Sequence, residues 1–284
     1  GDADLVARGV EQAAIGVYRS GRLVTVQRWF DWFDDHGLLQ QYPAVAVLGA
    51  WIQALGGHAA AAERWADAAE RGSYAGVLPD GSSIDGWRAL LRAKLCRHGV
   101  TQMRTDAELA LTLIPVGSLW RAPAQLLLGI SRLLGGDLGV ADDVLAEAVE
   151  VAQDTGATLA ASVALAERAL LAIRRQDWQD AAALVEQARS VVDTAHLEDC
   201  ATSIVLYAAA ARVAIHHGNR DQADQDLARA SQLQPQATHA LPYYAVQARL
   251  ELIRAHLALS DMAGARTVIR QVDDLLRWRP DLGI

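Results

Sequence analysis

Residues 129–148 read GISRLLGGDLGVADDVLAEA, and the spacing of small and apolar residues in this stretch decides the fold. Gly136 marks a turn between two segments whose apolar residues recur with the period of an α-helix. Gly129 precedes the turn by seven residues, and Ala141, Leu145 and Ala148 follow it by five, nine and twelve. Small residues at these places let two antiparallel helices approach closely. The stretch therefore predicts a helical hairpin.

The same spacing recurs along the chain, with turn positions at Gly57, Gly136, Gln176, Gly218 and Ser260. The intervals between them are 79, 40, 42 and 42 residues, and because 79 is about twice 40, a unit of roughly 40 residues repeats throughout. An alanine follows every turn by five residues, and small or apolar residues follow by nine and by twelve. The residues at nine are Ala66, Leu145, Val185, Leu227 and Ile269. The second helix of each unit is thus expected to present one small, apolar face.

Two more units complete the count. A degenerate one lies in the long interval, around His98 and Gly99, and Gly21 opens another after Ala14. In that first unit Val26, Phe30 and Phe33 stand at the matching offsets. Four units carry a capping side chain one residue after the turn, where an oxygen can accept from the free N–H groups of the next helix. These residues are Asp137, Asp177, Asn219 and Asp261.

Hairpins of this kind cannot bury both faces alone, so they stack into a solenoid with a concave inner surface. We predict an all-α fold: one right-handed superhelix of about seven hairpins over residues 1–284. The order of small, turn, Ala, large and Ala positions resembles the tetratricopeptide repeat (TPR), although that repeat has about 34 residues.

The opening of the chain carries a more specific resemblance. Trp29 and Trp32 are followed by Pro43, then Trp51, then the G-x-x-x-x-A pattern that begins at Gly57. This order resembles the MalT-like sensor region of the large LuxR-type ATP-dependent transcriptional regulators, and the likeness continues through GGDLGVADDVLAEAVEVAQDTG. The resemblance implies a multidomain regulator with a nucleotide-binding switch, this helical arm and a DNA-binding domain. Similar arms occur beside protein-kinase domains, so the parent could be a kinase instead.

Composition limits the function. Hydrophobic residues make up 52% and charged residues 21%, which is enough apolar surface for a folded core. The net charge of -8 is the wrong sign for binding phosphates, so we expect no direct contact with nucleic acid from this chain. Two cysteines, Cys96 and Cys200, fit a reducing, cytoplasmic location.

No apolar run reaches the length of a membrane span. The first residues, GDADL, and the last, RPDLGI, indicate a fragment of a longer protein.

Motifs for catalysis are missing, and we expect no enzyme activity, no cofactor and no metal. The sequence has no G-x-x-x-x-G-K-[ST] phosphate loop, no G-x-S-x-G elbow and no carboxylate pair fixed by a motif. Cys96 with His98, and His196 with Cys200, are the only metal candidates; unrelated buried cysteines are the favoured interpretation. The glycines at 135, 136 and 139 lie between helices and not after a strand, which argues against a dinucleotide site. The loop 72–83 is either a surface excursion or a lid over the groove.

Aromatic residues are expected mainly in the core. Trp29 and Trp65 fall on the apolar faces of second helices, and Trp178 should pack against a neighbouring unit. Trp51 differs, because it precedes its turn by six residues, a register that faces the concave groove in TPR-like stacks. Its equivalents are Ile130, Leu170, Arg212 and Arg254.

The candidate ligand-binding residues are Arg212, Arg254, Glu251, Trp51 and His216. The two arginines stand on adjacent rungs and would repel each other without a negative partner. Glu251 is that partner in one interpretation, and a ligand carboxylate, phosphate or sugar hydroxyl is the partner in the other. His216 and His217 end a helix, where a cation interacts well with the helix dipole, or else contact a ligand.

The sequence therefore predicts a sensor or interaction arm that binds a small-molecule inducer or a protein partner in its groove and communicates with other domains of its parent chain. The alternative is a passive protein–protein scaffold. An enclosed pocket with convergent polar groups would favour sensing, whereas a broad open groove would favour scaffolding.

Overall fold

The computed structural model describes residues 2–19, 23–74, 76–279 and 281–282. Within these ranges the chain forms fourteen α-helices, one short 3-10 helix and no strand, which confirms the all-α prediction. The helices are α1 (Asp2–Arg19), α2 (Leu23–Asp35), α3 (Pro43–Leu55), α4 (Ala59–Arg71), α5 (Ile84–Leu95), α6 (Gly99–Leu113), α7 (Arg121–Leu134), α8 (Leu138–Thr155), α9 (Thr158–Arg174), α10 (Trp178–Ala195), η1 (Ala201–Ser203), α11 (Ile204–His216), α12 (Arg220–Leu233), α13 (Pro242–Ala258) and α14 (Met262–Trp278).

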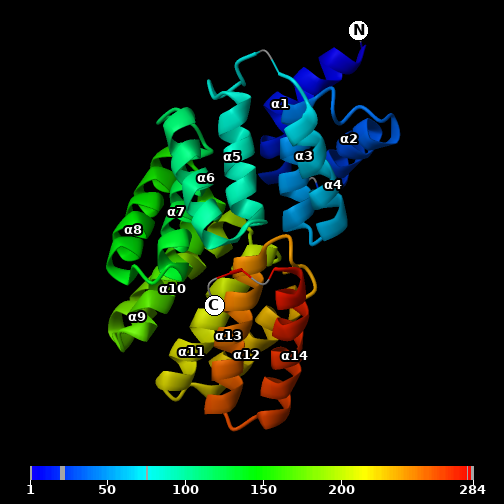
Figure 1. The fold of residues 1–284 in the computed structure, drawn as a ribbon. Helices are drawn as coiled ribbons and strands as arrows, with labels where there is room; N and C mark the ends of the chain where they lie inside the picture. The colour runs from blue at the N-terminus through cyan, green and yellow to red at the C-terminus, as the bar shows by residue number, and fades with distance from the viewer. Residues whose placement is uncertain (1, 20–22, 75, 280, 283–284) are drawn as a thin grey trace.

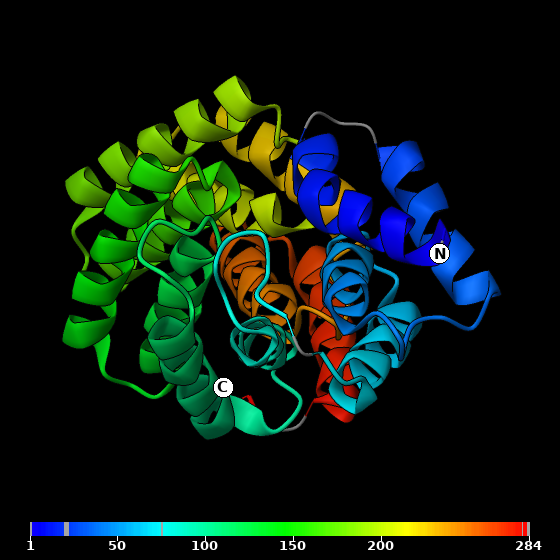
Figure 2. The same ribbon diagram turned by 90° about the horizontal axis from the view of Figure 1, so that it is seen from above.

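Consecutive helices pair into seven hairpins, from α1–α2 to α13–α14, as predicted. The first helix of each hairpin packs against the first helix of the next, so these helices form a continuous inner layer. The second helices lie outside this layer, and the hairpins wind into a superhelix (Figure 1). Seen from above, the hairpins form a ring (Figure 2).

The turn positions have the backbone that the repeat requires. Gly57, Gly136, Gln176, Gly218 and Ser260 all have positive φ, at 81°, 88°, 62°, 71° and 60°. This left-handed conformation ends the first helix and suits glycine. Gln176 and Ser260 adopt it despite a Cβ, at a cost of about 1 kcal/mol each, because the packed hairpins fix the turn. Gly21 lies outside the described residues, as does the side chain of Ala14.

The small residues lie where the two helices of a hairpin touch. A Cβ on Gly129 would come within 2.7 Å of the Leu145 side chain, and one on Gly49 would come within 2.0 Å of the Trp65 ring. The alanines that follow the turns by five residues are at most 1% exposed. The residues at nine are buried in four hairpins, but Ile269 is 44% exposed. The prediction is therefore wrong for this one position of α14, whereas Ala265 and Val272 are buried as expected. No described helix packs over that side of the last hairpin.

Three of the four predicted caps are confirmed. Asp177, Asn219 and Asp261 accept hydrogen bonds from the N–H groups three residues further on, at 3.1, 3.2 and 2.9 Å. Asp137 precedes its helix as expected but makes no such bond. Its carboxylate lies instead 3.5 Å from Arg104 and 3.7 Å from Arg132, because two guanidinium groups attract it more strongly than one N–H.

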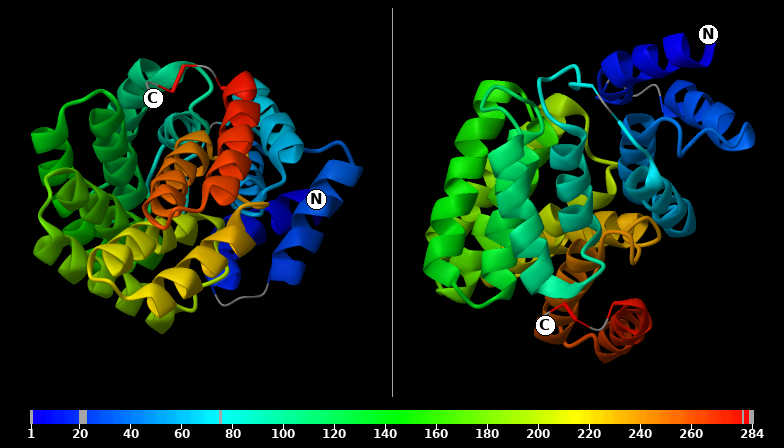
Figure 3. Two further views of the ribbon diagram at one scale, coloured as in Figure 1. Left: turned by 90° about the horizontal axis from the view of Figure 1, so that it is seen from below. Right: turned by 45° about the horizontal axis from the view of Figure 1, so that its top comes forward.

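The superhelix closes on itself near the C-terminus. Arg279 forms an ion pair with Glu63 of α4, and Leu282 is 1% exposed. A Cβ on Gly99 would lie 3.1 Å from the backbone oxygen of Asp281. Both views in Figure 3 place the end of the chain beside the turn between α5 and α6. The last hairpin is therefore held against the second and third hairpins as well as against the sixth.

The loop 72–83 is anchored to the third and fourth hairpins. The carboxylate of Asp80 accepts from the indole N–H of Trp87 at 3.3 Å and from the hydroxyl of Ser118 at 2.5 Å. Leu78 is buried, whereas Val77 is 75% exposed. These contacts favour the first of the two interpretations of this loop, a surface loop held in place, over a lid that covers the groove.

Ala181 provides the test of the hairpin register. Its side chain is fully buried between α9 and α10, so Ala181→Leu should destabilise the protein by roughly 1 to 3 kcal/mol through overpacking. Ala183→Leu on the exposed face of α10 should change stability by less than about 0.5 kcal/mol. Urea unfolding of both variants measures the difference, and equal midpoints for the two would show that the register is wrong.

Candidate functional site

Helix α13 overlaps the centre of the ring in the view of Figure 2 and lies below α3 and α5 in Figure 1, packed on α11 and α14. Every residue from Pro242 to Arg249 is buried, as is every residue of α3 and the run from Ile204 to Ala211 in α11. A helix that is buried all round needs neighbours on every side. Its polar side chains consequently face the inner surfaces of other hairpins rather than water, and the interior is filled rather than open.

Three of the predicted ligand-binding residues come together on this inner layer. Arg212 of α11 donates to Oε2 of Glu251 at 2.5 Å, and Arg254 donates to Oε1 of the same carboxylate. The Glu251 side chain is only 3% exposed, whereas Arg212 is 18% and Arg254 50% exposed. Glu251 thus neutralises the repulsion between the arginines, as one of the two sequence interpretations required. The three groups together have a net charge of one positive unit, because one carboxylate faces two guanidinium groups. The more exposed of the two guanidinium groups is that of Arg254.

A second polar pair, missed by the sequence analysis, lies one turn deeper on α13. The side-chain amide of Gln247 donates to Oε2 of Glu167 on α9 at 2.6 Å, and both side chains are buried. Burial raises the pKa of Glu167 to about 7, and the nearby negative charge of Glu251 acts in the same direction. The sequence feature that could have indicated this pair is Glu167 itself, the one glutamate in the otherwise mostly apolar run ASVALAERALLAI.

Trp51 lies apart from the arginine cluster. Its ring contacts Trp120, which directly precedes α7, at 5.1 Å between ring centroids. It also contacts Lys94 of α5, whose Nζ stands 3.9 Å from the centroid of the Trp51 ring. The ring is 7% exposed, so it is enclosed by the inner layer instead of lining an open groove. Burial lowers the pKa of Lys94 to about 7, since no carboxylate offsets the loss of hydration.

His216 is at the end of α11, one turn after Arg212. Its ring stacks on Trp178 with 4.0 Å between centroids and an interplanar angle of 5°. This contact joins the fifth and sixth hairpins and confirms the prediction that Trp178 packs against a neighbouring unit. Of the other two tryptophans expected in the core, Trp65 is 1% exposed and Trp29 is half-buried.

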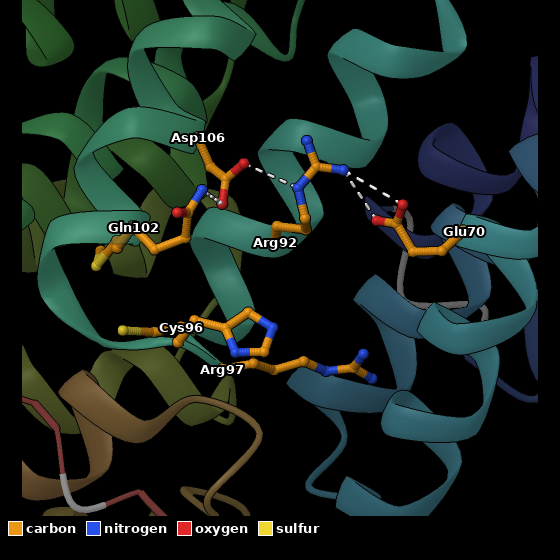
Figure 4. Close-up of a pocket in the computed structure, with 8 residues that line it drawn as sticks. Glu70, Arg92, Cys96, Arg97, Gln102 and Asp106 are labelled. Atoms are coloured by element: carbon orange, nitrogen blue, oxygen red, sulfur yellow. Dashed lines mark hydrogen bonds and ion pairs between the residues drawn. The ribbon is translucent and has the colours of Figure 1, made fainter.

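A small pocket of about 200 Å³ lies between α4, α5 and α6 (Figure 4). The guanidinium group of Arg92 spans it, donating to Asp106 at 2.8 Å and to Glu70 at 3.0 Å. Gln102 donates to the second oxygen of Asp106 at 3.2 Å. The full lining is Glu70, Arg92, Cys96, Arg97, His98, Gln102, Met103 and Asp106. Its charged groups are largely paired with one another.

Neither cysteine has an activated thiol. Burial raises the pKa of the Cys96 and Cys200 thiols to about 11, which keeps both protonated at neutral pH. Among the residues that the structure describes, no group of three histidine, cysteine or acidic side chains is arranged to hold a metal ion. Nor is any described helix long and apolar enough to cross a membrane.

The stacked hairpins and inner layer define the class: this is a TPR-like helical-repeat protein. The model of the MalT-like TPR region matches residues 84–280, from α5 to beyond α14. The chain therefore belongs to the MalT-like TPR family, as the resemblance of its opening residues implied. No curated protein matches the sequence.

Three solved structures are similar to the chain at low identity, with TM-scores below 0.5. BtubC (BKLC) from P. vanneervenii is 14% identical, with a TM-score of 0.44 over 84% of this chain and 90% of that chain. A Rap protein in complex with Competence and Sporulation Factor is 8% identical, with a TM-score of 0.43 over 95% of this chain and 97% of that chain. Human IFIT1 with m7Gppp-AAAA is 14% identical, with a TM-score of 0.45 over 91% of this chain and 57% of that chain.

Proposed function

We propose that this chain is the sensor or interaction arm of a larger signal-transduction regulator that controls transcription. It binds an inducer or a protein partner on its inner layer and passes the signal to the other domains of the parent chain. Membership of the MalT-like TPR family supports this role. A passive scaffold and the regulatory arm of a protein kinase are the alternatives, and neither requires polar groups that converge inside the superhelix.

The convergence of Arg212 and Arg254 on the buried Glu251 is the observation that carries the proposal. A guanidinium group binds planar acceptors through paired hydrogen bonds, and the half-exposed Arg254 can exchange Glu251 for a ligand oxygen. The unneutralised positive charge favours a ligand with a carboxylate, a phosphate or several hydroxyl groups. His216 lies on the same face of α11 and extends the site toward the fifth hairpin.

The filled interior argues against a passive scaffold. A scaffold needs a broad groove for its partner, but α3, α11 and α13 are largely buried in this structure. Suppose that the parent protein has two states, which differ in the position of α13. A ligand that binds the arginines more tightly in one of these states shifts the equilibrium toward that state. Such a ligand acts only through unequal affinity for the two states.

The test uses the full-length regulator and its transcriptional response. Arg212→Ala combined with Arg254→Ala should abolish the response. This variant leaves the buried Glu251 without its partners, at a cost of about 3 kcal/mol, so circular dichroism at the assay temperature has to show that the helical fold is retained. Arg254→Gln alone keeps the ion pair between Arg212 and Glu251. It should raise the inducer concentration needed for half of the full response at least tenfold, because one charge-assisted hydrogen bond to the ligand is lost.

The matched control is Arg220→Ala with Arg277→Ala, because both arginines are more than 70% exposed on the outer helices of the same two hairpins. This control should respond like the wild type. A full response from the Arg212 and Arg254 variants would exclude the proposed site and leave the fold assignment unchanged.

A further inference from the structure

Glu167 and Gln247 face each other across the interior with one hydrogen bond formed and one missing. The amide N–H of Gln247 donates to Oε2 of Glu167 at 2.6 Å. The other two oxygens of the pair, Oε1 of Glu167 and Oε1 of Gln247, are both buried and both without a hydrogen-bond partner. A buried polar atom without a partner costs about 1 to 3 kcal/mol, so two of them in one contact require an explanation.

A single proton satisfies both atoms. A carboxylate has only acceptor oxygens, so it cannot bond the carbonyl oxygen of Gln247. A carboxylic acid can, because protonated Oε1 of Glu167 becomes a donor. Glu167 and Gln247 then form two reciprocal hydrogen bonds in one ring, with O–H to the amide oxygen and amide N–H to the acid oxygen.

We propose that Glu167 carries a proton while α13 holds the position seen in this structure, and that loss of this proton loosens the contact between α13 and α9. Deprotonation puts a negative charge in a buried site and breaks one of the two reciprocal bonds. The inference goes beyond the proposed ligand site, since it does not depend on what the inner layer binds.

The groups around Glu167 agree with a neutral acid. Arg174, two turns further along α9, favours the charged form, but Glu251 on α13 opposes it. The α11 residue Arg212 is already paired with Glu251. Tyr243 and Tyr244 on α13 lie close enough for the charge of Glu167 to raise the pKa of both phenols. Lys94 of α5 stands 5.9 Å from the ring centroid of Tyr244. Burial outweighs these effects and raises the pKa of Glu167 to about 7.

The direction of the pH effect follows from that shift. The pKa of Glu167 is higher in the folded protein, at about 7, than its ordinary value of 4.5. The contact therefore contributes its full stability below about pH 4.5 and loses it as pH rises through about 7. Between these limits, the equilibrium constant for release of α13 should rise about tenfold for each pH unit.

Glu167→Gln tests the proposal directly, because a glutamine at 167 forms the same pair of reciprocal bonds but cannot lose a proton. Infrared spectra of the wild type at about pH 6 should contain the C=O band of a protonated carboxylic acid that Glu167→Gln removes. Hydrogen exchange of the α13 amides between about pH 5 and 6.5, corrected for intrinsic rates, should speed up with pH in the wild type and stay constant in the variant. This range lies below the pKa of Lys94, so titration of that residue does not contribute. Glu186→Gln, 75% exposed on α10, is the matched control and should behave like the wild type.

Glu167→Leu guards against a misleading result from a single variant. It leaves the Gln247 amide without a partner, so α13 should exchange faster than in Glu167→Gln throughout the range from about pH 5 to 6.5, with no dependence on pH there. The proposal is wrong if the acid band is absent at about pH 6, or if protection of α13 changes with pH equally in the wild type and Glu167→Gln.

Discussion

Lys94→Met should stabilise the protein by roughly 2 to 4 kcal/mol at neutral pH. Lys94 is the only lysine in the chain, it is 3% exposed, and its Nζ faces the rings of Trp51 and Tyr244 rather than a carboxylate. Burial lowers its pKa from 10.5 to about 7, which means that folding disfavours the ammonium form. Methionine keeps the unbranched apolar chain and removes the amine.

The pH profile of this gain has a definite sign. A lysine whose folded pKa is lowered penalises folding most at low pH, and the penalty shrinks as pH rises from about 7 to 10.5. Urea unfolding at about pH 6, 8 and 10 should show the advantage of Lys94→Met falling across the series. Arg266→Met on the exposed side of α14 should show no such trend. If Lys94→Met were instead less stable at about pH 6, attraction between the ammonium and the Trp51 ring would outweigh the lost hydration.

The repeat architecture could be predicted from the sequence because its cause is local. The two helices of one hairpin touch through residues at fixed distances from the turn, as Gly129 and Leu145 do. Every hairpin therefore needs small or apolar residues at the same distances from its own turn. The turn positions likewise need a left-handed backbone, which Gly57 and Gly218 adopt readily. Ile269 departs from the pattern because burial at its position depends on a following hairpin, which is not a local property.

The filled interior could not be predicted, since it depends on the pitch of the superhelix. Glu167 and Gln247 are 80 residues apart, and Arg279 and Glu63 are 216 apart. A repeat of 40 residues specifies how neighbours stack but not whether the seventh hairpin meets the second. The enclosure of Trp51 follows from the same closure, so a register that faces a groove in an open solenoid faces other helices here.

The arginine cluster lies between these two cases. The spacing of Arg212 and Arg254 predicted adjacent rungs, and Glu251 was a candidate for their compensating charge. The degree of burial, which decides how strongly the three groups depend on one another, comes only from the structure. That dependence has a measurable consequence.

Glu251→Met should destabilise the protein by about 3 kcal/mol, because it leaves the mostly buried guanidinium group of Arg212 without its carboxylate. Replacing Arg212 as well, in Arg212→Met with Glu251→Met, should recover much of this loss, since an apolar pair removes both buried charges. Arg254, half exposed, remains hydrated in either variant.

A double-mutant cycle separates this structural dependence from a site that waits for a ligand. For Arg212 and Glu251 we expect a coupling energy above about 1 kcal/mol. The exposed pair of Arg220 and Asp224, 4.0 Å apart on α12, serves as the control and should give less than about 0.5 kcal/mol. Equal coupling in the two pairs would mean that Glu251 is not needed to neutralise Arg212. Strong coupling confined to the Arg212 pair would instead require a ligand to compete mainly for Arg254, so that Arg254→Gln alone would abolish ligand binding at little cost in stability.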